Sequence, residues 1–547
     1  KDFFGHTPLV MRLQEFTESE QKLIFENHAP DEVFETFQAE VQRFDLDALL
    51  PNPQFLKLFA DAYIESGKYF TDKRSIFSQA VEHLAREANS NIKSIGHGPS
   101  TTQKADLASK AFAILVLSGA EGVSTNEAFE DRMYPLLASL YEDSSVADSI
   151  LATRLFRPGD TASQHRPIHK IVSEYCAARY LTKRISNPRD PLTLANCLPI
   201  IAPNLTVRDE LRGLLGWMAS LGNKPIEMAS IELDPYAILA NGDPSQLEPS
   251  SRKHLVSKLK DVEDIDPYFR RGDFWRKLSV AGFFTKDVID EIRPLLTDTT
   301  EGHLRDLILE LLKGSPIIAQ LSGELRQLIL SPTSSANTRL LANSCLLELT
   351  KYDHKADIAV LIFEASQTSL NVVAKTIETL GLKTFHRQYL SNFLRVCASL
   401  YPGHQSRLSR TIGSRYFVKR FIGKMDLTTT EWLLDDLTRT LSCTCSKKSY
   451  ECDCRNGISK IVGSLLDQYF EMASPPYDPR RVWQWLRNLN FHGHGGRKES
   501  TAVQVLRKNH ELRQSIIALV FRDLTDRDQI FKAKIYQFDL YSHAGLQ

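Results

Sequence analysis

The 547 residues are more than one hydrophobic core usually supports, so we expect about three or four domains. Lysine plus arginine and aspartate plus glutamate number 67 each, and the resulting zero net charge argues against a broad surface that tracks nucleic-acid phosphates. No segment resembles a secretory signal, no apolar run approaches the ~20 residues that span a bilayer, and the eight cysteines are sparse, so the sequence predicts a cytoplasmic protein.

The first predicted helices follow residue 17. Thr17 and Glu20 have the spacing of a capping box, in which each residue bonds the other's free backbone N–H. Asn52 and Pro53 suit the start of a second helix, because Asn caps free N–H groups and Pro fits a first position whose N–H is unpaired anyway. A third helix is predicted from about Asp72.

Because the chain opens without methionine, we expect it to be a fragment or a processed chain.

A stretch rich in Ser, Gly, Asn and Thr at residues 89–103 predicts a linker, and a hairpin between helices follows it. Pro167 is well placed to begin the last helix, which would put His169 in its first turn. Helices followed by a hairpin and one more helix are the element order of a winged helix. The predicted elements are helices at 107–117 and 133–140, a strand at 151–156 and a turn at 158–160.

From about residue 186 onwards the pattern is helix after helix. Residues 292–296 match residues 325–329, and residues 304–307 match residues 338–341, which sets a period of about 33 residues. Such a period is typical of HEAT- or TPR-like two-helix repeats, which bury each other's apolar faces. An irregular helical bundle is the alternative. The sequence therefore predicts a mainly α fold.

The most informative segment is residues 165–181, HRPIHKIVSEYCAARYL. It resembles the winged-helix signature of NACHT-type STAND NTPases, in which a His is followed five residues later by Glu, then by an aromatic residue and two alanines. This chain departs from the pattern at Ser173, where many members have Gln, and at Cys176, where many have Leu. The matching positions are His169, Glu174, Tyr175, Ala177 and Ala178.

Two further segments resemble the same family. Residues 49–58 are similar to the Asn-Pro-Leu-x-Leu segment of the helical domain behind the nucleotide-binding core, and residues 10–17 are similar to the exit from that core. The matches extend over roughly a third of the chain. The resemblance implies the end of an NTPase core at 1–16, a helical domain at 17–95, a winged helix at 104–185, helical repeats at 186–410, and a C-terminal helical region with a Cys-rich loop at 411–547.

The resemblance also implies a nucleotide site. In the family the winged-helix His contacts the terminal phosphate of bound ADP and holds the inactive state, so His169 would be the nucleotide sensor and Pro53 would pack on the adenine. An imidazole at a helix start can donate to a phosphate oxygen. From the residues alone, His169 could instead pair with Glu174 or a backbone carbonyl. No Gly-x-x-x-x-Gly-Lys-Ser/Thr loop occurs, so ADP or ATP with Mg²⁺ would be bound mainly by an upstream core, and this chain would not be catalytic alone.

The function implied is regulated signalling. A protein ligand would dock on the helical C-terminal region, and nucleotide exchange, homo-oligomerisation and activation of a separate N-terminal effector would follow. Similarity to bacterial members suggests antiviral defence through recognition of a phage protein. Two alternatives stay open: a helical-repeat scaffold that never switches, and a winged-helix module that binds nucleic acid. The neutral charge argues against the second alternative.

Four cysteines form a cluster that predicts a metal site. Four thiolates in one loop can complete a tetrahedral zinc shell, which would be structural because no open coordination position remains. Unligated thiols and disulfides are the alternatives. The cluster consists of Cys443, Cys445, Cys452 and Cys454. The other cysteines lie in apolar helical contexts and are predicted to be buried, namely Cys176, Cys197, Cys345 and Cys397.

Overall fold

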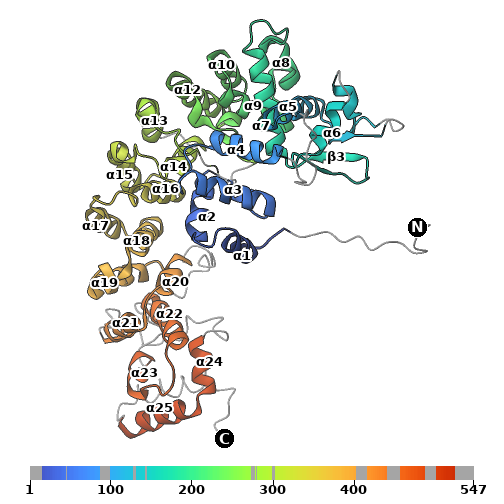
Figure 1. Cartoon of the computed structure of the whole chain (residues 1–547). Coiled ribbons are helices and arrows are strands. Elements are labelled where there is room, and N and C mark those ends of the chain that lie inside the picture. The colour runs from blue at the N-terminus through green and yellow to red at the C-terminus, as the bar shows by residue number, and fades with distance from the viewer. Residues whose placement is uncertain are drawn as a thin grey trace, which may run out of the picture. The chain divides into compact units, whose positions relative to one another are not determined.

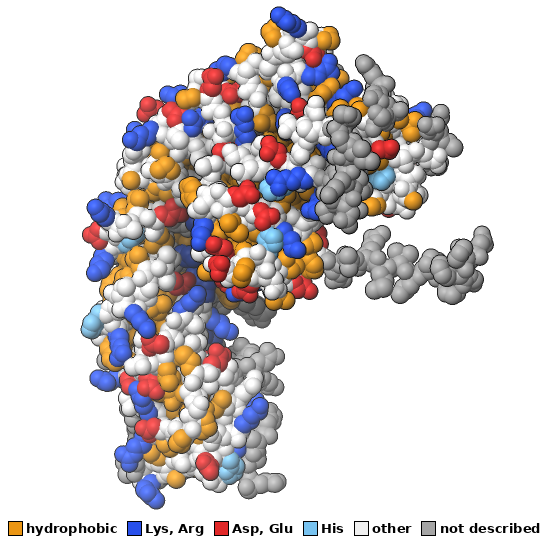
Figure 2. Space-filling view, viewed as in Figure 1, with side chains coloured by type: hydrophobic (Ala, Val, Ile, Leu, Met, Phe, Trp, Pro, Cys, Tyr) orange, Lys and Arg blue, Asp and Glu red, His pale blue; other side chains and the backbone are white. Residues whose placement is uncertain are grey.

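The computed structural model is mainly helical, as the sequence predicts (Figure 1). The chain divides into two compact units, Lys1–Leu321 and Ser322–Gln547. No helix in the described segments is long and apolar enough to cross a membrane. On the face drawn in Figure 2, basic and acidic side chains are interspersed. The structure describes residues 15–44, 46–86, 99–126, 131–141, 145–272, 278, 280–298, 302–401, 416–439, 456–486 and 501–523.

Four helices open the first unit, and the starts of α1, α3 and α4 are those predicted from the sequence. The Glu20 carboxylate accepts a hydrogen bond from the Thr17 backbone N–H at 2.8 Å, which closes the capping box of α1. The side chain of Asn52 accepts one from the Gln54 N–H at 2.9 Å, and Pro53 occupies the first position of α3. The helices are α1 (Glu18–His28), α2 (Phe34–Arg43), α3 (Pro53–Glu65) and α4 (Lys73–Ala85).

A three-stranded antiparallel sheet follows, with the strand order β1-β3-β2. The register pairs Val123 with His165, and Phe156 with Pro167. Helices α5 and α7 pack against each other along their lengths. The elements are α5 (Thr101–Ser118), β1 (Val123–Ser124), the 3-10 helix η2 (Leu137–Leu140), α6 (Ser145–Leu151), β2 (Phe156–Pro158), β3 (Gln164–Pro167) and α7 (Lys170–Ile185).

Two predicted elements of this region are wrong. The helix predicted at 133–140 is only the short η2, because the carbonyls of Met133 and Pro135 accept hydrogen bonds from the segment of β1 instead of from a following helical turn. The strand predicted at 151–156 lies later, as β2, because α6 continues to Leu151. The hairpin itself is present, shifted toward the C-terminus by the extra helical residues.

An aromatic cluster around Trp217 of α9 forms the centre of the first unit. Its ring lies 4.9 Å from that of Phe77 on α4 and 5.0 Å from that of Tyr175 on α7. All three side chains are buried, so the cluster ties α4 to both α7 and α9. The remaining α-helices of this unit are α8 (Leu194–Ile201), α9 (Arg212–Leu221), α10 (Lys224–Leu233), α11 (Pro235–Ala240), α12 (Pro249–Ile265), α13 (Ile289–Thr297) and α14 (Leu304–Leu312).

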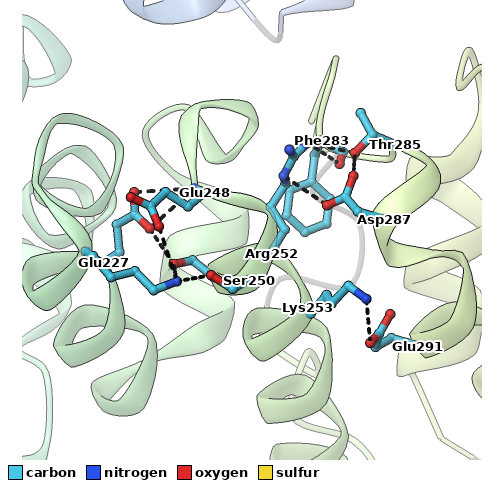
Figure 3. A network of polar contacts seen from close by, with 11 residues as sticks. Glu227, Glu248, Ser250, Arg252, Lys253, Phe283, Thr285, Asp287 and Glu291 are labelled. Carbon is cyan, nitrogen blue, oxygen red and sulfur yellow. Dashed lines mark hydrogen bonds and ion pairs between the residues drawn. The ribbon is translucent and has the colours of Figure 1, made fainter.

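A polar network joins α10, α12 and the start of α13 (Figure 3). Glu227 is buried, and its carboxylate accepts hydrogen bonds from the Ser251 hydroxyl and from the Glu248 backbone N–H. Arg252 donates to the Thr285 hydroxyl at 2.8 Å and lies 3.5 Å from a carboxylate oxygen of Asp287. Burial raises the pKa of Glu227. The bonds of Glu227 satisfy a carboxylate that helix packing has removed from water, whereas Arg252 Nε and Asp287 Oδ2 are buried 3.5 Å apart without a hydrogen bond.

In the second unit, helices pack on their neighbours and on the next helix but one, for example α15 on α17, α16 on α18, and α21 on α23. The result is two rows of helices in contact. The helices are α15 (Ser322–Leu330), α16 (Ala336–Leu346), α17 (His354–Glu364), α18 (Gln367–Leu380), α19 (Arg387–Ala398), α20 (Tyr416–Ile422), α21 (Leu427–Arg439), α22 (Asn456–Met472), α23 (Pro479–Leu486), α24 (Thr501–Lys508) and α25 (His510–Asp523).

Buried ion pairs connect the helices of this second unit. Arg339 on α16 is 1% exposed and donates to both carboxylate oxygens of Glu364, at 2.8 and 2.6 Å. It also donates to the carbonyl of Ile329 at 2.7 Å. On α21, Asp435 accepts hydrogen bonds from Arg481 and from the indole of Trp485, both at 2.7 Å. The buried indole of Trp485 and the part-exposed guanidinium of Arg481 therefore both contact α21.

Candidate functional site

His169 is the N-cap of α7 and not a residue of its first turn, which corrects the prediction from the sequence. Pro167 ends β3, and the N–H of Ile168 still donates to the carbonyl of Leu155 across the hairpin at 2.9 Å. Because this pairing continues past the proline, α7 begins only at Lys170. The His169 backbone is extended, with φ −157° and ψ 146°, as is usual for an N-cap.

The cap fixes which ring nitrogen of His169 carries the proton. Nδ1 accepts a hydrogen bond from the Ile171 backbone N–H at 3.2 Å. A neutral imidazole has one acceptor and one donor, so the proton lies on Nε2. No hydrogen bond to Nε2 is found among the described residues, which leaves a donor available for a ligand. The alternative of pairing with Glu174 is not observed, and that carboxylate lies 3.6 Å from the Lys170 ammonium instead.

The structure brings the start of α3 next to the start of α7. The ring of Phe55 meets that of His169 edge to face, with centroids 5.6 Å apart and planes 82° apart. Pro53 stands two residues before Phe55, at the first position of α3, and is exposed. Two residues proposed as nucleotide contacts therefore lie on neighbouring helix starts, although about 115 positions separate them in the sequence.

His169 is half-buried, and its surroundings favour the neutral ring. Burial lowers the pKa of His169, and the positive charge of Arg157 on β2 lowers it further. Its ordinary value is 6.5, so the imidazole is neutral at pH 7. A neutral ring that accepts at Nδ1 donates only through Nε2, which makes it a directional contact and not a point charge.

A cavity of about 400 Å³ lies beside the start of α7, on the side of Lys170. The C-terminal end of α5, the β2–β3 hairpin, the first turns of α7 and the 3-10 helix η4 (Asp209–Leu211) form its walls. Its lining is partly apolar. The charged lining residues are Arg157, Arg166, Lys170, Glu121, Glu174 and Glu210.

Most charged groups around this cavity are paired with one another. Arg166 lies 2.8 Å from Glu121 and 2.9 Å from Asp160, and Glu210 lies 2.5 Å from Arg208. Arg157 differs, because it is exposed and has no carboxylate partner in the parts of the chain that the structure describes. It was not predicted as a site residue, since a single arginine in a short strand carries no pattern.

The cysteines proposed as a zinc site lie outside the described residues, namely Cys443, Cys445, Cys452 and Cys454. Within the described segments, no group of three or more His, Cys, Asp or Glu side chains is placed to hold a metal ion. The four remaining cysteines are buried, as predicted, and burial raises the pKa of the Cys176 thiol to about 12 and of Cys197 to about 11.

Helix α17 has an apolar stripe that faces solvent, which the sequence does not predict. The side chain of Phe363 is 91% exposed, and that of Val360 is 47% exposed. Ala356 and Ala359 continue the same face at helical spacing and are exposed. In the sequence, apolar residues at such spacing predict a core-facing stripe, so only the structure identifies this one as a surface.

Comparisons with known proteins found no relatives. No protein-family model matches the chain, and neither the curated proteins nor the solved structures contain a significant match.

Proposed function

We propose that this chain is the nucleotide-regulated switch and the ligand-sensing portion of a NACHT-type STAND NTPase. The observation that carries the proposal is the geometry of His169. Its Nδ1 is used by the helix cap, its Nε2–H is available as a donor, and its ring lies against the helix start that bears Pro53. In the proposed closed state, Nε2–H donates to the terminal phosphate of ADP held by an upstream NTPase core.

The arrangement of elements supports this assignment. The order α5, β1, α6, β2, β3 and α7 is that of a winged helix, in which the hairpin precedes the helix that His169 caps. The two rows of helices in the second unit suit a repeat region that offers a long binding surface. We infer that a protein ligand, for which a phage protein is the leading class, binds this region, favours the open state and thereby promotes oligomerisation and effector activation.

The test uses the longer protein that includes the sequence upstream of Lys1. The upstream sequence should contain a phosphate-binding loop, and its absence would refute the proposal directly. The variant His169→Ser keeps a side chain that can cap α7 but removes the Nε2–H donor. We expect this variant to unfold like the wild type and to retain ADP about tenfold less tightly after purification, because one hydrogen bond to a charged phosphate is lost.

A matched control separates the sensor role from nonspecific effects. His254 is part-exposed in the same unit and pairs with Glu232, so His254→Ser should leave nucleotide retention unchanged. Bound nucleotide is measured by chromatography of the denatured protein, and assembly by size-exclusion chromatography with light scattering. Equal ADP retention in His169→Ser and wild type would contradict the proposed role of the histidine.

A second candidate function is a protein-binding scaffold that never switches, and the exposed stripe of α17 favours it. The stripe exposes Phe363 and Val360 side by side, and a contiguous apolar patch on a surface is typical of a protein interaction site. Hydrogen exchange with and without nucleotide distinguishes the switch from the scaffold. A scaffold shows the same hydrogen-exchange pattern around His169 with ADP, with ATP and without nucleotide, whereas a switch shows protection that depends on the nucleotide.

A further inference from the structure

The cavity beside α7 has the size and the lining of a small-molecule site. Its volume of about 400 Å³ falls within the range of roughly 300–1,000 Å³ that is usual for such sites. Leu115, Val116, Ala120 and Pro167 supply an apolar wall. An isolated oxyanion would leave this wall uncovered, so the shape suits a ligand that has an apolar body.

The register of the hairpin creates an uncompensated positive charge at the cavity. Arg157 on β2 is paired directly with Arg166 on β3, and like charges opposite each other in a sheet repel. Arg166 is paired with Glu121 and Asp160, whose side chains are 51% and 77% exposed and so offset its charge only in part. Arg157 has no such partner in the described part of the chain and lines the cavity.

A second cation, Lys170, lines the same cavity from the start of α7. The Lys170 side chain is 66% exposed, and its ammonium lies 3.6 Å from Glu174, longer than a direct hydrogen bond. Lys170 is also the first residue of α7, where free backbone N–H groups favour negative charge. The lining of the cavity therefore combines two cationic groups from two elements with apolar side chains.

We propose that this cavity binds a small organic anion, with Arg157 and Lys170 holding its oxyanion group and with the apolar wall covering its body. A guanidinium presents two parallel N–H donors that match a carboxylate or a phosphate monoester. The lining carboxylates Glu121, Glu174 and Glu210 disfavour a polyanion, because they lie in the same walls. The proposal is independent of the nucleotide switch, since it concerns a different ligand and involves no upstream core.

Binding is tested on this chain itself by isothermal titration calorimetry. The probes are phenyl phosphate, benzoate and inorganic phosphate, with neutral benzyl alcohol as the uncharged analogue. We expect phenyl phosphate or benzoate to bind, inorganic phosphate to bind more weakly, and benzyl alcohol not to bind at millimolar concentration. Comparison of phenyl phosphate with benzoate distinguishes a phosphate ligand from a carboxylate ligand. Failure of both to bind would overturn the proposal.

Three variants assign the binding to the cavity. Arg157→Gln and Lys170→Gln should each weaken binding about tenfold, because each removes one charge-assisted contact. Arg189→Gln removes an exposed arginine that does not line the cavity, and should leave binding unchanged. If Arg189→Gln weakens binding as much as the other two variants, the anion is held by general surface charge and the proposal is wrong.

The thermal unfolding temperature of Arg157→Gln gives a second test of the site, because it reports the repulsion between Arg157 and Arg166 and does not require tight binding. Without ligand, Arg157→Gln should unfold at a slightly higher temperature than the wild type, because the repulsion from Arg166 is removed. With saturating phenyl phosphate the order should reverse, because only the wild type is stabilised by the ligand. An unchanged order at saturation would contradict an anion site at Arg157.

Discussion

Replacing Gly213 with alanine should destabilise the first unit, although alanine is the better helix former. Gly213 lies in the first turn of α9 and is buried against the carboxylate of Glu174 on α7. A β-carbon at this position would lie within 2.5 Å of the carboxylate carbon and of both oxygens. Glu174 is itself only 5% exposed, so its carboxylate has little room to retreat. The position of the Glu174 carboxylate therefore requires a glycine at residue 213, which lies 39 positions later in the sequence.

The opposing contributions can be compared in magnitude. Alanine gains about 1 kcal/mol over glycine in a helix interior. Overpacking of a buried site costs about 1–3 kcal/mol, and moving the buried Glu174 carboxylate away from the Lys170 ammonium adds to this cost. The steric and electrostatic costs exceed the gain in propensity, so Gly213→Ala should lose about 2 kcal/mol.

The assay is hydrogen exchange with mass spectrometry, which reports the local stability of α7 and α9 separately from that of the second unit. Gly323→Ala is the matched control, because Gly323 also lies in a helix but a β-carbon there meets nothing within 4 Å. The control should gain up to about 1 kcal/mol. In the double variant with Glu174→Ala, the penalty of Gly213→Ala should largely disappear. A Gly213→Ala protein as stable as the wild type, or a penalty that persists without Glu174, would refute the reasoning.

Three other predictions follow from buried groups and from the exposed stripe. Arg339→Met should lose about 3 kcal/mol in the second unit, since it leaves Glu364 without its partner. Arg339 lowers the pKa of Glu364 below its ordinary 4.5. The stabilisation from this ion pair is therefore complete above the unfolded-state pKa of Glu364 and is lost as the pH falls through its folded-state pKa. The free energy of unfolding of Arg339→Met should accordingly depend less on pH in the acid range than that of the wild type. Phe363→Ser should leave thermal unfolding unchanged, and a clear drop would show that this side chain is packed. The buried cysteines should resist iodoacetamide until the chain is denatured, as peptide mapping would show for Cys176, Cys197, Cys345 and Cys397.

Helix boundaries with a local chemical cause were predictable from the sequence. Thr17 with Glu20, and Asn52 with Pro53, begin helices because the capping side chain and the free N–H groups lie within four residues of each other. The start of α21 has the same kind of local cause, because the Asp426 carboxylate accepts a hydrogen bond from the N–H of residue 429 at 2.7 Å and the Thr430 hydroxyl donates to the Asp426 carbonyl.

The candidate site was predictable only in part. The pattern of residues 165–181 singled out His169 through its resemblance to a family, and Pro53 through a second segment. The sequence did not predict that Phe55 would join the two segments, because that contact depends on how α3 packs near α7. It also placed His169 three positions too deep in the helix, because the hairpin pairing that ends at Pro167 is a long-range contact.

The sequence by itself determined the helical character of this protein, the starts of α1, α3 and α4, the burial of four cysteines and the segment that suggests a nucleotide sensor. These features depend on local periodicity and on side chains that bond nearby backbone. Only the tertiary structure decided that Arg157 faces Arg166 over a cavity and that the apolar stripe of α17 faces solvent. Strand register and the exposed face of a helix are set by residues distant in the chain, so local pattern does not determine them.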